Sequence, residues 1–388
     1  MDASRNERLA PLTGVRFAAA VGILLFHYGG PLVAWAPPWV ERVRAGGHVW
    51  VGLFYLLSGF VLARAHPAPM RPDERRGFWA ARMARLYPAY LLAFLLAAPF
   101  ALERWPAGTP LADAKAAIVA AAALLLVQAW IPPIARLWNA PGWSASAVAA
   151  FYALFPFAVA RLAPLSRRGL AAAAGGAWLV TLSLPAAWLL LRPDGVVTAL
   201  TWGEPPWLEA LKFHPLARAG EFVAGVALGL LDRRRALLAR GGAPLAASAF
   251  AAVVGLIAWG GVPYVLLHNG ALLPLLALVV LGASRAGGPV GRALASRPAI
   301  LLGNASFALY ALQEPLWRWA RRLTGAAGEP SGAFVLGFAA VAVALSVAVS
   351  VGLARPARRA ARAALARAGR VRLHALPQLA RGERGSGR

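Results

Sequence analysis

Apolar stretches long enough to cross a lipid bilayer follow one another along this chain from about residue 8 to about residue 354. A membrane-spanning helix needs about 20 mostly apolar residues, because each residue advances about 1.5 Å through a hydrocarbon layer of about 30 Å. Polar or proline- and glycine-rich breaks separate the stretches. They delimit eleven candidate segments, at roughly 9–29, 49–65, 80–101, 113–130, 146–163, 170–191, 215–231, 243–260, 263–283, 299–319 and 332–354.

The composition indicates that lipid is the solvent for most side chains. Apolar residues make up 60% of the 388 residues and charged residues 14%, whereas soluble domains average about 45–50% and about 25%. With so little polar surface, the chain is predicted to be an all-α integral membrane protein. It contains no cysteine and six scattered histidines without zinc-like spacing, so we expect neither disulfides nor a metal site.

The net charge of +25 is carried almost entirely by arginine. The arginines gather at the ends of apolar segments and in residues 355–388, a pattern typical of cytoplasmic loops and of segments that bind anionic lipid. This pattern disfavours nucleic acid as a partner. It predicts a transmembrane domain at 1–354, a basic cytoplasmic tail at 355–388 on anionic membrane lipid, and both termini in the cytoplasm. The alanine, glycine and arginine content suggests a GC-rich bacterial genome, and the expected location is the inner membrane of a bacterium.

Two cytoplasmic termini require an even number of crossings, which eleven segments do not satisfy. Counting inward from the arginine clusters at both ends places the conflict between residues 78 and 130. One segment there is expected to enter and return, or to lie in the interface. We therefore predict a bundle of about ten transmembrane helices with one re-entrant or interfacial segment. Irregular backbone is tolerated at that depth only around a protein-lined cavity, so a functional cavity is expected near residues 78–130.

Ionisable groups inside apolar segments cost about 2.5–3.5 kcal/mol each and are functional candidates by default. Arg16 and His27 lie on the first segment. Their spacing places them about 20° apart on one helix face and about 16 Å apart along its axis. A guanidinium suits phosphate, and a neutral imidazole suits proton transfer. The alternative is a helix-end anchor and a histidine bonded to a backbone carbonyl.

Arg82 and Arg85 share a helix face because they are three residues apart. Two guanidiniums at a cytoplasmic mouth could clamp a phosphorylated ligand. The alternative interpretation is that both are ordinary positive-inside anchors.

Two carboxylates also lie within apolar segments. Glu314 precedes Pro315, and the proline is expected to break the helix and free a backbone carbonyl. A carboxylate beside a broken membrane helix is difficult to explain by packing alone, and Glu314 is expected to share a cavity with His27. Glu221 follows Arg218 by one turn, which favours a structural ion pair.

Six short motifs occur in a fixed order across residues 10–354, and each is weak alone. They are Leu12-Thr13-Gly14-Val15-Arg16 running to Leu25-Phe26-His27; Leu53-Phe54-Tyr55-Leu56-Leu57-Ser58-Gly59-Phe60; Arg82 and Arg85 followed by Tyr87-Pro88-Ala89-Tyr90; Trp143-Ser144 with Phe151-Tyr152 and Pro156; Glu221-Phe222 with Gly225; and Gly303-Asn304-Ala305-Ser306-Phe307-Ala308-Leu309-Tyr310. Together they resemble the motifs of acyltransferase family 3, the bacterial multi-pass O-acyltransferases.

This resemblance implies transfer of an acyl group, with acetyl expected, from cytoplasmic acyl-CoA to a hydroxyl of an envelope glycan or other cell-surface acceptor. It implies no permanently bound cofactor. Arg82 and Arg85, with Arg16, would hold the donor phosphates, and His27 would be the general base. Whether the acyl group passes first to Ser144 or His27 is left open.

Two departures from the family pattern stand out. The glutamate usual after Trp143-Ser144 is replaced within residues 147–149, and the usual histidine before the late proline is Gln313. One hypothesis is that Glu314 replaces the missing carboxylate. A multi-pass transporter or exporter and a non-catalytic envelope-assembly protein remain the alternatives. The absence of an internal repeat weighs against a transporter.

Overall fold

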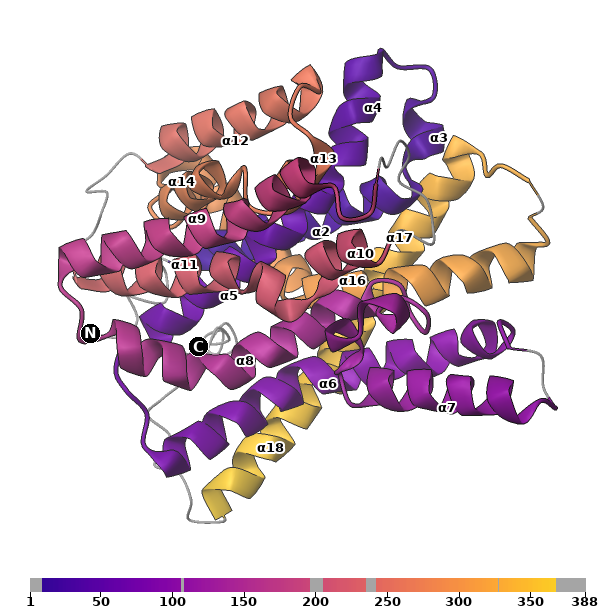
Figure 1. Cartoon of the computed structure of the whole chain (residues 1–388), viewed down its shortest axis with the longest axis horizontal. Coiled ribbons are helices and arrows are strands. Elements are labelled where there is room, and N and C mark those ends of the chain that lie inside the picture. Colours follow the sequence, from indigo (N-terminus) through magenta and orange to yellow (C-terminus); the bar gives the residue numbers. More distant parts are fainter. Residues whose placement is uncertain (1–8, 106–107, 196–204, 235–241, 327, 368–388) are drawn as a thin grey trace, which may run out of the picture.

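A computed structural model describes residues 9–105, 108–195, 205–234, 242–326 and 328–367, apart from the side chains of residues 362, 365 and 366. Regular structure in this part of the chain is entirely helical, as predicted (Figure 1). The α-helices are α2 (Ala10–Tyr28), α3 (Gly30–Val33), α4 (Pro38–Ala45), α5 (Val49–Ala65), α6 (Pro72–Leu102), α7 (Pro110–Leu124), α8 (Gly142–Leu162), α9 (Arg167–Leu191), α10 (Pro206–Phe213), α11 (Pro215–Arg234), α12 (Gly242–Trp259), α13 (Tyr264–His268), α14 (Leu273–Ala283), α15 (Gly288–Leu294), α16 (Arg297–Thr324), α17 (Gly332–Val349) and α18 (Arg355–Arg367). Shorter turns are η1 (Gly46–His48), η2 (Gln128–Trp130), η3 (Pro132–Ile134) and the π-helical η4 (Ser350–Ala354).

Eight helical segments of the described chain are long and apolar enough to cross a membrane: Ala10–Tyr28, Pro38–Ala65, Pro72–Leu102, Gly142–Leu162, Arg167–Leu191, Gly242–Trp259, Tyr264–Ala283 and Gly332–Ala361. Helices α11 and α16 have 20 and 28 residues but carry several charged side chains. Twelve residues of α11 are buried, so this helix belongs to the interior of the bundle. The exact count of about ten crossings stays a prediction.

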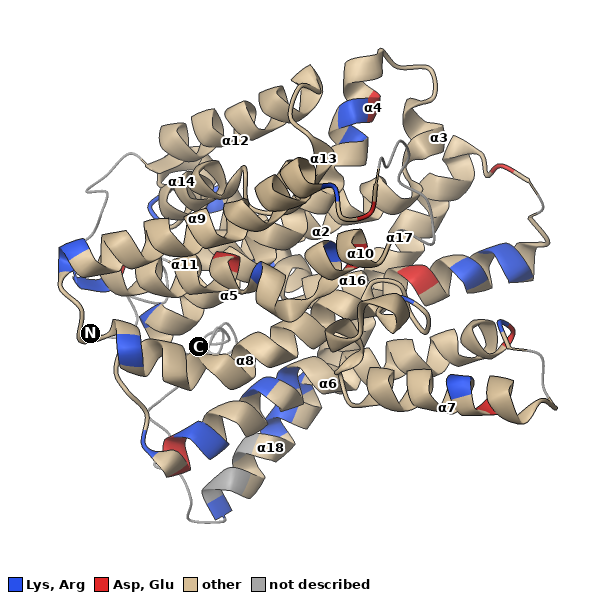
Figure 2. Cartoon of the chain, in the orientation of Figure 1, with Lys and Arg blue, Asp and Glu red and all other residues tan. Residues whose placement is uncertain are grey.

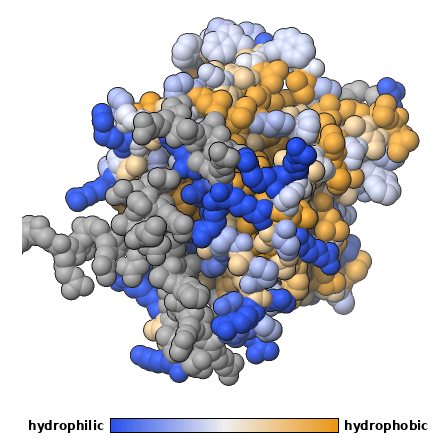
Figure 3. All heavy atoms as spheres, turned by 90° about the vertical axis from the view of Figure 1, so that its left-hand side faces the viewer, coloured by the Kyte–Doolittle hydropathy of each residue, from blue (hydrophilic) through white to orange (hydrophobic). Residues whose placement is uncertain are grey.

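Arginine is concentrated at one end of the bundle, which we call the basic end. Figure 2 shows basic residues at the start of α6, the end of α8, the start of α9 and along α18. Figure 3 looks onto this end and shows hydrophilic side chains over much of it. Helix α2 leads away from it toward α3 and α4, which lie at the opposite end (Figure 1). This asymmetry is the one that the positive-inside rule describes.

Helix α7 departs from the span expected at 113–130. It ends at Leu124 and has only 15 residues, about 22 Å of helix, which is too short to cross the hydrocarbon layer. It folds back beside α6 as a hairpin (Figure 1). Residues 125–141 then lack an α-helix and contain only η2 and η3 before α8 begins. The short helix and the irregular backbone lie in and just after the region predicted to re-enter, and re-entry itself stays a prediction.

Polar side chains satisfy the irregular backbone of residues 123–142. An unpaired backbone group costs several kcal/mol in lipid, so such a segment needs partners from the protein. Tyrosines of the Tyr87–Tyr90 motif supply two of these partners. The bonds are Tyr87 Oη to Leu124 O (3.0 Å), Tyr90 Oη to Ala123 O (2.7 Å), Ser146 Oγ to Leu126 O (2.6 Å) and Gln128 Nε2 to Gly142 O (2.9 Å).

Glycines allow two helix pairs of the core to approach closely. A Cβ at Gly59 of α5 would overlap the Phe222 carbonyl of α11, and one at Gly225 would overlap the backbone of α5 in turn. A Cβ at Gly303 of α16 would overlap the Thr13 carbonyl of α2. Small residues at such crossings are typical of membrane bundles. The second crossing places α2 directly against α16, which carries Gln313 and Glu314.

The ion pair expected on α11 is present. Arg218 is fully buried and donates from Nε and Nη2 to the two carboxylate oxygens of Glu221, each at 3.0 Å. Its Nη1 lies 2.6 Å from His268 Nδ1 on α13. A buried guanidinium is tolerated only with partners of this kind. The predicted Arg218–Glu221 ion pair is therefore confirmed.

Candidate active site

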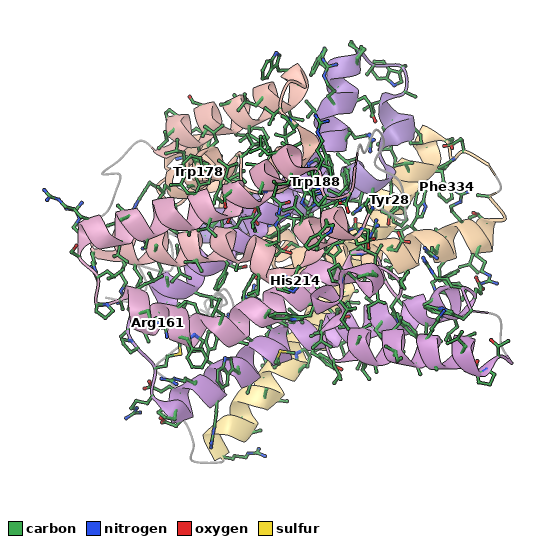
Figure 4. All side chains as sticks on the ribbon, in the orientation of Figure 1. Tyr28, Arg161, Trp178, Trp188, His214 and Phe334 are labelled. Carbon is green, nitrogen blue, oxygen red and sulfur yellow. The ribbon has the colours of Figure 1, made fainter. Side chains whose placement is uncertain are left out.

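Helix α2 presents its two ionisable residues to two different cavities. Arg16 lines a small cavity of about 60 Å³, which we call the inner cavity. His27, in the last turn of α2, lines a cavity of about 700 Å³, which we call the outer cavity. The two residues are about 16 Å apart along the helix. Figure 4 shows Tyr28, next to His27, far from Arg161 at the basic end.

The inner cavity collects residues from the family-like motifs. Helices α2, α5, α6, α8 and α16 each contribute to its lining. Its polar lining residues are Arg16, Tyr55, Ser58, Arg85, Ser144, Tyr152, Ser306 and Tyr310. The Tyr55 hydroxyl is buried and makes no hydrogen bond within the described chain. An orphaned buried hydroxyl is costly, so a polar ligand group reaching this cavity would gain a ready partner.

The arginines predicted to bind the donor are only partly brought together. Arg16 and Arg85 both line the inner cavity, and neither forms a hydrogen bond or ion pair with a described residue. Arg82 does not line it, although its charge lies within electrostatic range of Arg16. The Arg82 guanidinium instead lies 5.6 Å from the centre of the Phe78 ring. Arg85 is therefore better placed than Arg82 to contact a ligand in the inner cavity.

His27 is exposed to the outer cavity and is oriented by Gln313. Its Nδ1 lies 3.4 Å from Gln313 Oε1, while Gln313 Nε2 donates to the Tyr310 carbonyl at 3.1 Å. The carbonyl accepts only from the amide NH₂, so the Gln313 oxygen must face His27. His27 Nδ1 is then the donor, which leaves the Nε2 lone pair available as a base. In the sequence, Gln313 was identified only as a departure from the family's usual histidine, and its contact with His27 was not predicted.

Glu314 lines the outer cavity together with His27, as expected. Its carboxylate accepts from Tyr28 Oη at 2.9 Å and from Arg318 Nε at 2.7 Å. Arg318 could have been anticipated, because it follows Glu314 by four residues on the same helix. Tyr28 could not, because its contact joins residues 286 apart in sequence. A catalytic role for Glu314 stays a prediction.

The expected break at Pro315 is absent, because α16 continues through it from Arg297 to Thr324. Proline has no N–H, so the Ala311 carbonyl loses its helical partner. Asn139 Nδ2 supplies a replacement hydrogen bond to this carbonyl at 3.1 Å. The proline therefore creates an attachment point for the irregular segment before α8 instead of ending the helix. Local sequence could not reveal a partner 172 residues away.

Glu314 does not occupy the position of the carboxylate missing after Trp143-Ser144. Among residues 147–149, Ala147 is fully buried and Val148 lines the inner cavity. Glu314 lines the outer cavity. The two positions therefore line different cavities, and a functional replacement by Glu314 stays a hypothesis.

Two short stretches of chain contribute residues to the linings of both cavities. Pro141 lines the outer cavity and Ser144 the inner one, and Ser144 Oγ donates to the Pro141 carbonyl at 3.2 Å. On α16, Tyr310 lines the inner cavity and Glu314 the outer one. We call these two turns, residues 141–144 and 310–314, the partition. The sequence contained no sign of it.

Comparison with known proteins identifies the family. A family model described as an acyltransferase domain matches residues 10–355. Acyltransferase MdmB of Streptomyces mycarofaciens is 29% identical over 364 residues, which cover 87% of this chain and 89% of MdmB. Protein 2 in picA locus of Rhizobium radiobacter is 37% identical over 112 residues, which cover 28% of this chain and 54% of that protein. Solved structures provide no match.

The match spans nearly the whole described bundle, including the helices that line both cavities. The chain therefore belongs to acyltransferase family 3 and is a multi-pass membrane acyltransferase that transfers groups other than aminoacyl groups.

Proposed function

We propose that this acyltransferase moves an acyl group, with acetyl expected, from cytoplasmic acyl-CoA to a hydroxyl of an envelope glycan or another cell-surface acceptor. One observation carries the proposal. A single helix, α2, presents Arg16 to the inner cavity and His27 to the outer cavity. A donor held by its phosphates near Arg16 can therefore reach His27 with an arm about 16 Å long.

The donor enters from the basic end. Arg16 and Arg85 are the unpaired guanidiniums of the inner cavity, and guanidinium is the side-chain group best suited to phosphate. The pantetheine arm of the donor is slender and carries amides. The hydroxyls of the inner cavity, among them the orphaned Tyr55 hydroxyl, offer hydrogen-bond partners for these amides. The arm crosses the partition to bring the thioester to the outer cavity.

The acceptor occupies the outer cavity, whose volume of about 700 Å³ lies in the range of ligand sites. His27 Nε2 removes the proton of the acceptor hydroxyl as its oxygen attacks the thioester carbonyl. The C–S bond breaks, and the departing CoA thiolate takes the proton from His27. The products are an ester and free CoA, and the imidazole returns to its neutral form.

Glu314 supports this cycle by its charge. It lies within electrostatic range of His27 and is held in place by Tyr28 and Arg318. A nearby carboxylate stabilises the imidazolium that forms during proton transfer. Ser144 faces the inner cavity, away from His27, which favours direct transfer over an acyl-serine intermediate.

The test uses purified protein in lipid nanodiscs with radiolabelled acetyl-CoA and an envelope extract as the acceptor source. We expect CoA release and label transfer with the wild type, and neither with His27→Gln. A transporter would leave acetyl-CoA intact, and so would an assembly protein. Equal CoA release by wild type and His27→Gln would exclude the proposed chemistry.

A further inference from the structure

Three arginines lie in the second half of α16, beside the end of α2 and away from the basic end (Figure 2). They are Arg318, Arg321 and Arg322. The positive-inside rule accounts for the arginines of the basic end, including those of α18. Helix α18 is the first part of the tail predicted at 355–388, and residues 368–388 lie outside the described chain. The same rule does not account for arginines at the far end, so these three need another explanation.

Two of the three arginines have structural roles. Arg321 and Arg322 lie in the last turn of α16, where cations offset the helix dipole. Arg321 Nη2 also donates to the Gly328 carbonyl at 2.8 Å and so holds the chain that leaves the helix. Arg322 Nη1 donates to Glu103 at 2.6 Å, in an exposed ion pair. Arg318 lies before the last turn, and neither role applies to it.

Arg318 lines the outer cavity, and most of its hydrogen-bond donors are unused. Its Nε donates to Glu314 Oε1 at 2.7 Å, while the other oxygen of Glu314 accepts from Tyr28. The carboxylate therefore holds only the Nε edge of the guanidinium. Nη1 and Nη2, which we call the Arg318 fork, form no hydrogen bond with a described residue. The parallel N–H groups of such a fork match the two oxygens of a carboxylate or a phosphate.

The other charges that line the outer cavity leave this fork open to a ligand. Arg44 donates to both oxygens of Glu41, at 2.6 Å each, so its charge is compensated. Glu329 also lines the cavity, but it is exposed, and an exposed carboxylate competes only weakly for a cation. The Phe100 ring centre lies 5.8 Å from the guanidinium carbon of Arg318 and supports the group on one side. The fork is therefore fixed in position and faces a cavity in which it lacks a partner.

We propose that the Arg318 fork binds an acidic group of the acceptor, a carboxylate or a phosphate, and thereby presents a hydroxyl of that acceptor to His27. The inference rests on the proposed function and identifies the acceptor class as an acidic envelope glycan. His27 and Arg318 line the same cavity. Tyr28, the neighbour of His27, shares the carboxylate of Glu314 with Arg318, so the fork lies beside the proposed base.

The first measurement determines the charge of the acceptor. Wild-type protein in nanodiscs transfers label from radiolabelled acetyl-CoA to an envelope extract, and the labelled glycan is applied to an anion exchanger. We expect the label to be retained. One portion of the extract is first amidated with carbodiimide and methylamine, which removes carboxylate charge, and another is treated with cold hydrogen fluoride, which cleaves phosphate esters. Loss of labelling after one of these treatments identifies the acidic group.

The second measurement compares Arg318→Gln with Arg322→Gln. Both arginines pair with a glutamate and both lie over Phe100, at 5.8 and 5.5 Å from the ring centre, but only Arg318 lines the outer cavity. We expect Arg318→Gln to raise the extract concentration at half-maximal transfer about tenfold or more, because a charge-assisted contact with the acceptor is lost. CoA binding should not change. Arg322→Gln should change the half-maximal concentration less than about twofold, as an exposed pair does.

Several outcomes would overturn the inference. These are a labelled glycan that the anion exchanger does not retain, labelling that survives both treatments, and equal effects of the two variants. A lower maximal rate of Arg318→Gln at an unchanged half-maximal concentration would mean that Arg318 only positions Glu314. If the wild type transfers no label, the proposed function fails first. Should Arg318→Gln not fold, Arg318→Lys serves instead, since it keeps the charge and loses the fork, and it should weaken the acceptor as well.

Discussion

Gln313 Oε1 on α16 lies 3.4 Å from Nδ1 of His27, the proposed base on α2. Gln313 is the residue that stands where the family usually has a histidine. The Tyr310 carbonyl fixes which end of the Gln313 amide faces His27. The imidazole is thereby directed with Nε2 free to accept a proton. A family position that looked like a loss in the sequence is thus a positioning contact in the fold.

Replacing Gln313 with leucine should release this constraint. We expect turnover to fall about tenfold, the worth of one hydrogen bond, while CoA binding stays unchanged. Nitrogen-15 NMR of labelled histidine checks the cause directly. The wild type should show His27 protonated at Nδ1, and Gln313→Leu should show a mixture of tautomers. An Nε2-protonated His27 in the wild type would contradict the assignment.

Replacing His27 tests the chemistry itself. His27→Ala and His27→Gln should each lower transfer by about 10²–10⁴, the usual cost of losing a general base. CoA binding and membrane insertion should be nearly intact, because His27 lines the outer cavity, whereas Arg16 and Arg85 line the inner one. Glutamine can keep a structural hydrogen bond but cannot act as a base. Near-normal turnover in His27→Gln would show that the imidazole has only a structural role.

Arginine-to-lysine replacements rank the donor residues. Arg85→Lys keeps the charge and loses bidentate geometry, so CoA binding should weaken by about tenfold. Arg82→Lys should weaken it less, because Arg82 does not line the inner cavity. Titration of CoA into each variant checks the order. An effect of Arg82→Lys larger than that of Arg85→Lys would place the phosphates elsewhere.

Two variants of Ser144 distinguish a residue that the donor arm must pass from a residue that is itself acylated. Ser144→Leu adds bulk to the partition and should block transfer while CoA still binds at the arginines. Ser144→Ala removes the hydroxyl without adding bulk, and transfer should fall by less than about tenfold. Both rates are measured with labelled acetyl-CoA. Complete loss in Ser144→Ala, with CoA binding retained, would instead indicate an acyl-serine intermediate.

We expect the free energy of unfolding to depend on pH through His66, the residue that follows α5. Burial, and then the charge of Arg82, lower the pKa of His66 from 6.5 to about 4. Between these values the unfolded chain binds a proton that the folded chain does not, so stability falls as pH falls. The slope is at most about 1.4 kcal/mol per pH unit for one group.

The matched variant is His66→Phe, because it keeps an aromatic ring that cannot titrate. The His66 ring packs edge-on against Phe78, with 5.5 Å between the ring centres. Thermal unfolding in detergent from pH 7 to pH 4 should show a shallower loss of stability for His66→Phe than for the wild type. Parallel curves would mean that His66 does not titrate in this window.

The sequence determined the features that depend on local periodicity. Apolar length predicted the helices, and helical spacing put Arg16 and His27 on one face of α2. Charge at a spacing of one turn predicted the Arg218–Glu221 pair. These features follow from the regular geometry of an α-helix, which advances about 1.5 Å and turns about 100° per residue.

Only the tertiary structure decided which compartment each residue faces. Arg16 and His27 share a helix face, yet the partition assigns them to two cavities. Glu314 lines a different cavity from the position of the carboxylate absent at 147–149. Pro315 is compatible with a continuous helix, because Asn139 bonds the Ala311 carbonyl. These outcomes depend on contacts between residues more than 100 positions apart, and such contacts arise from helix packing that local pattern does not encode.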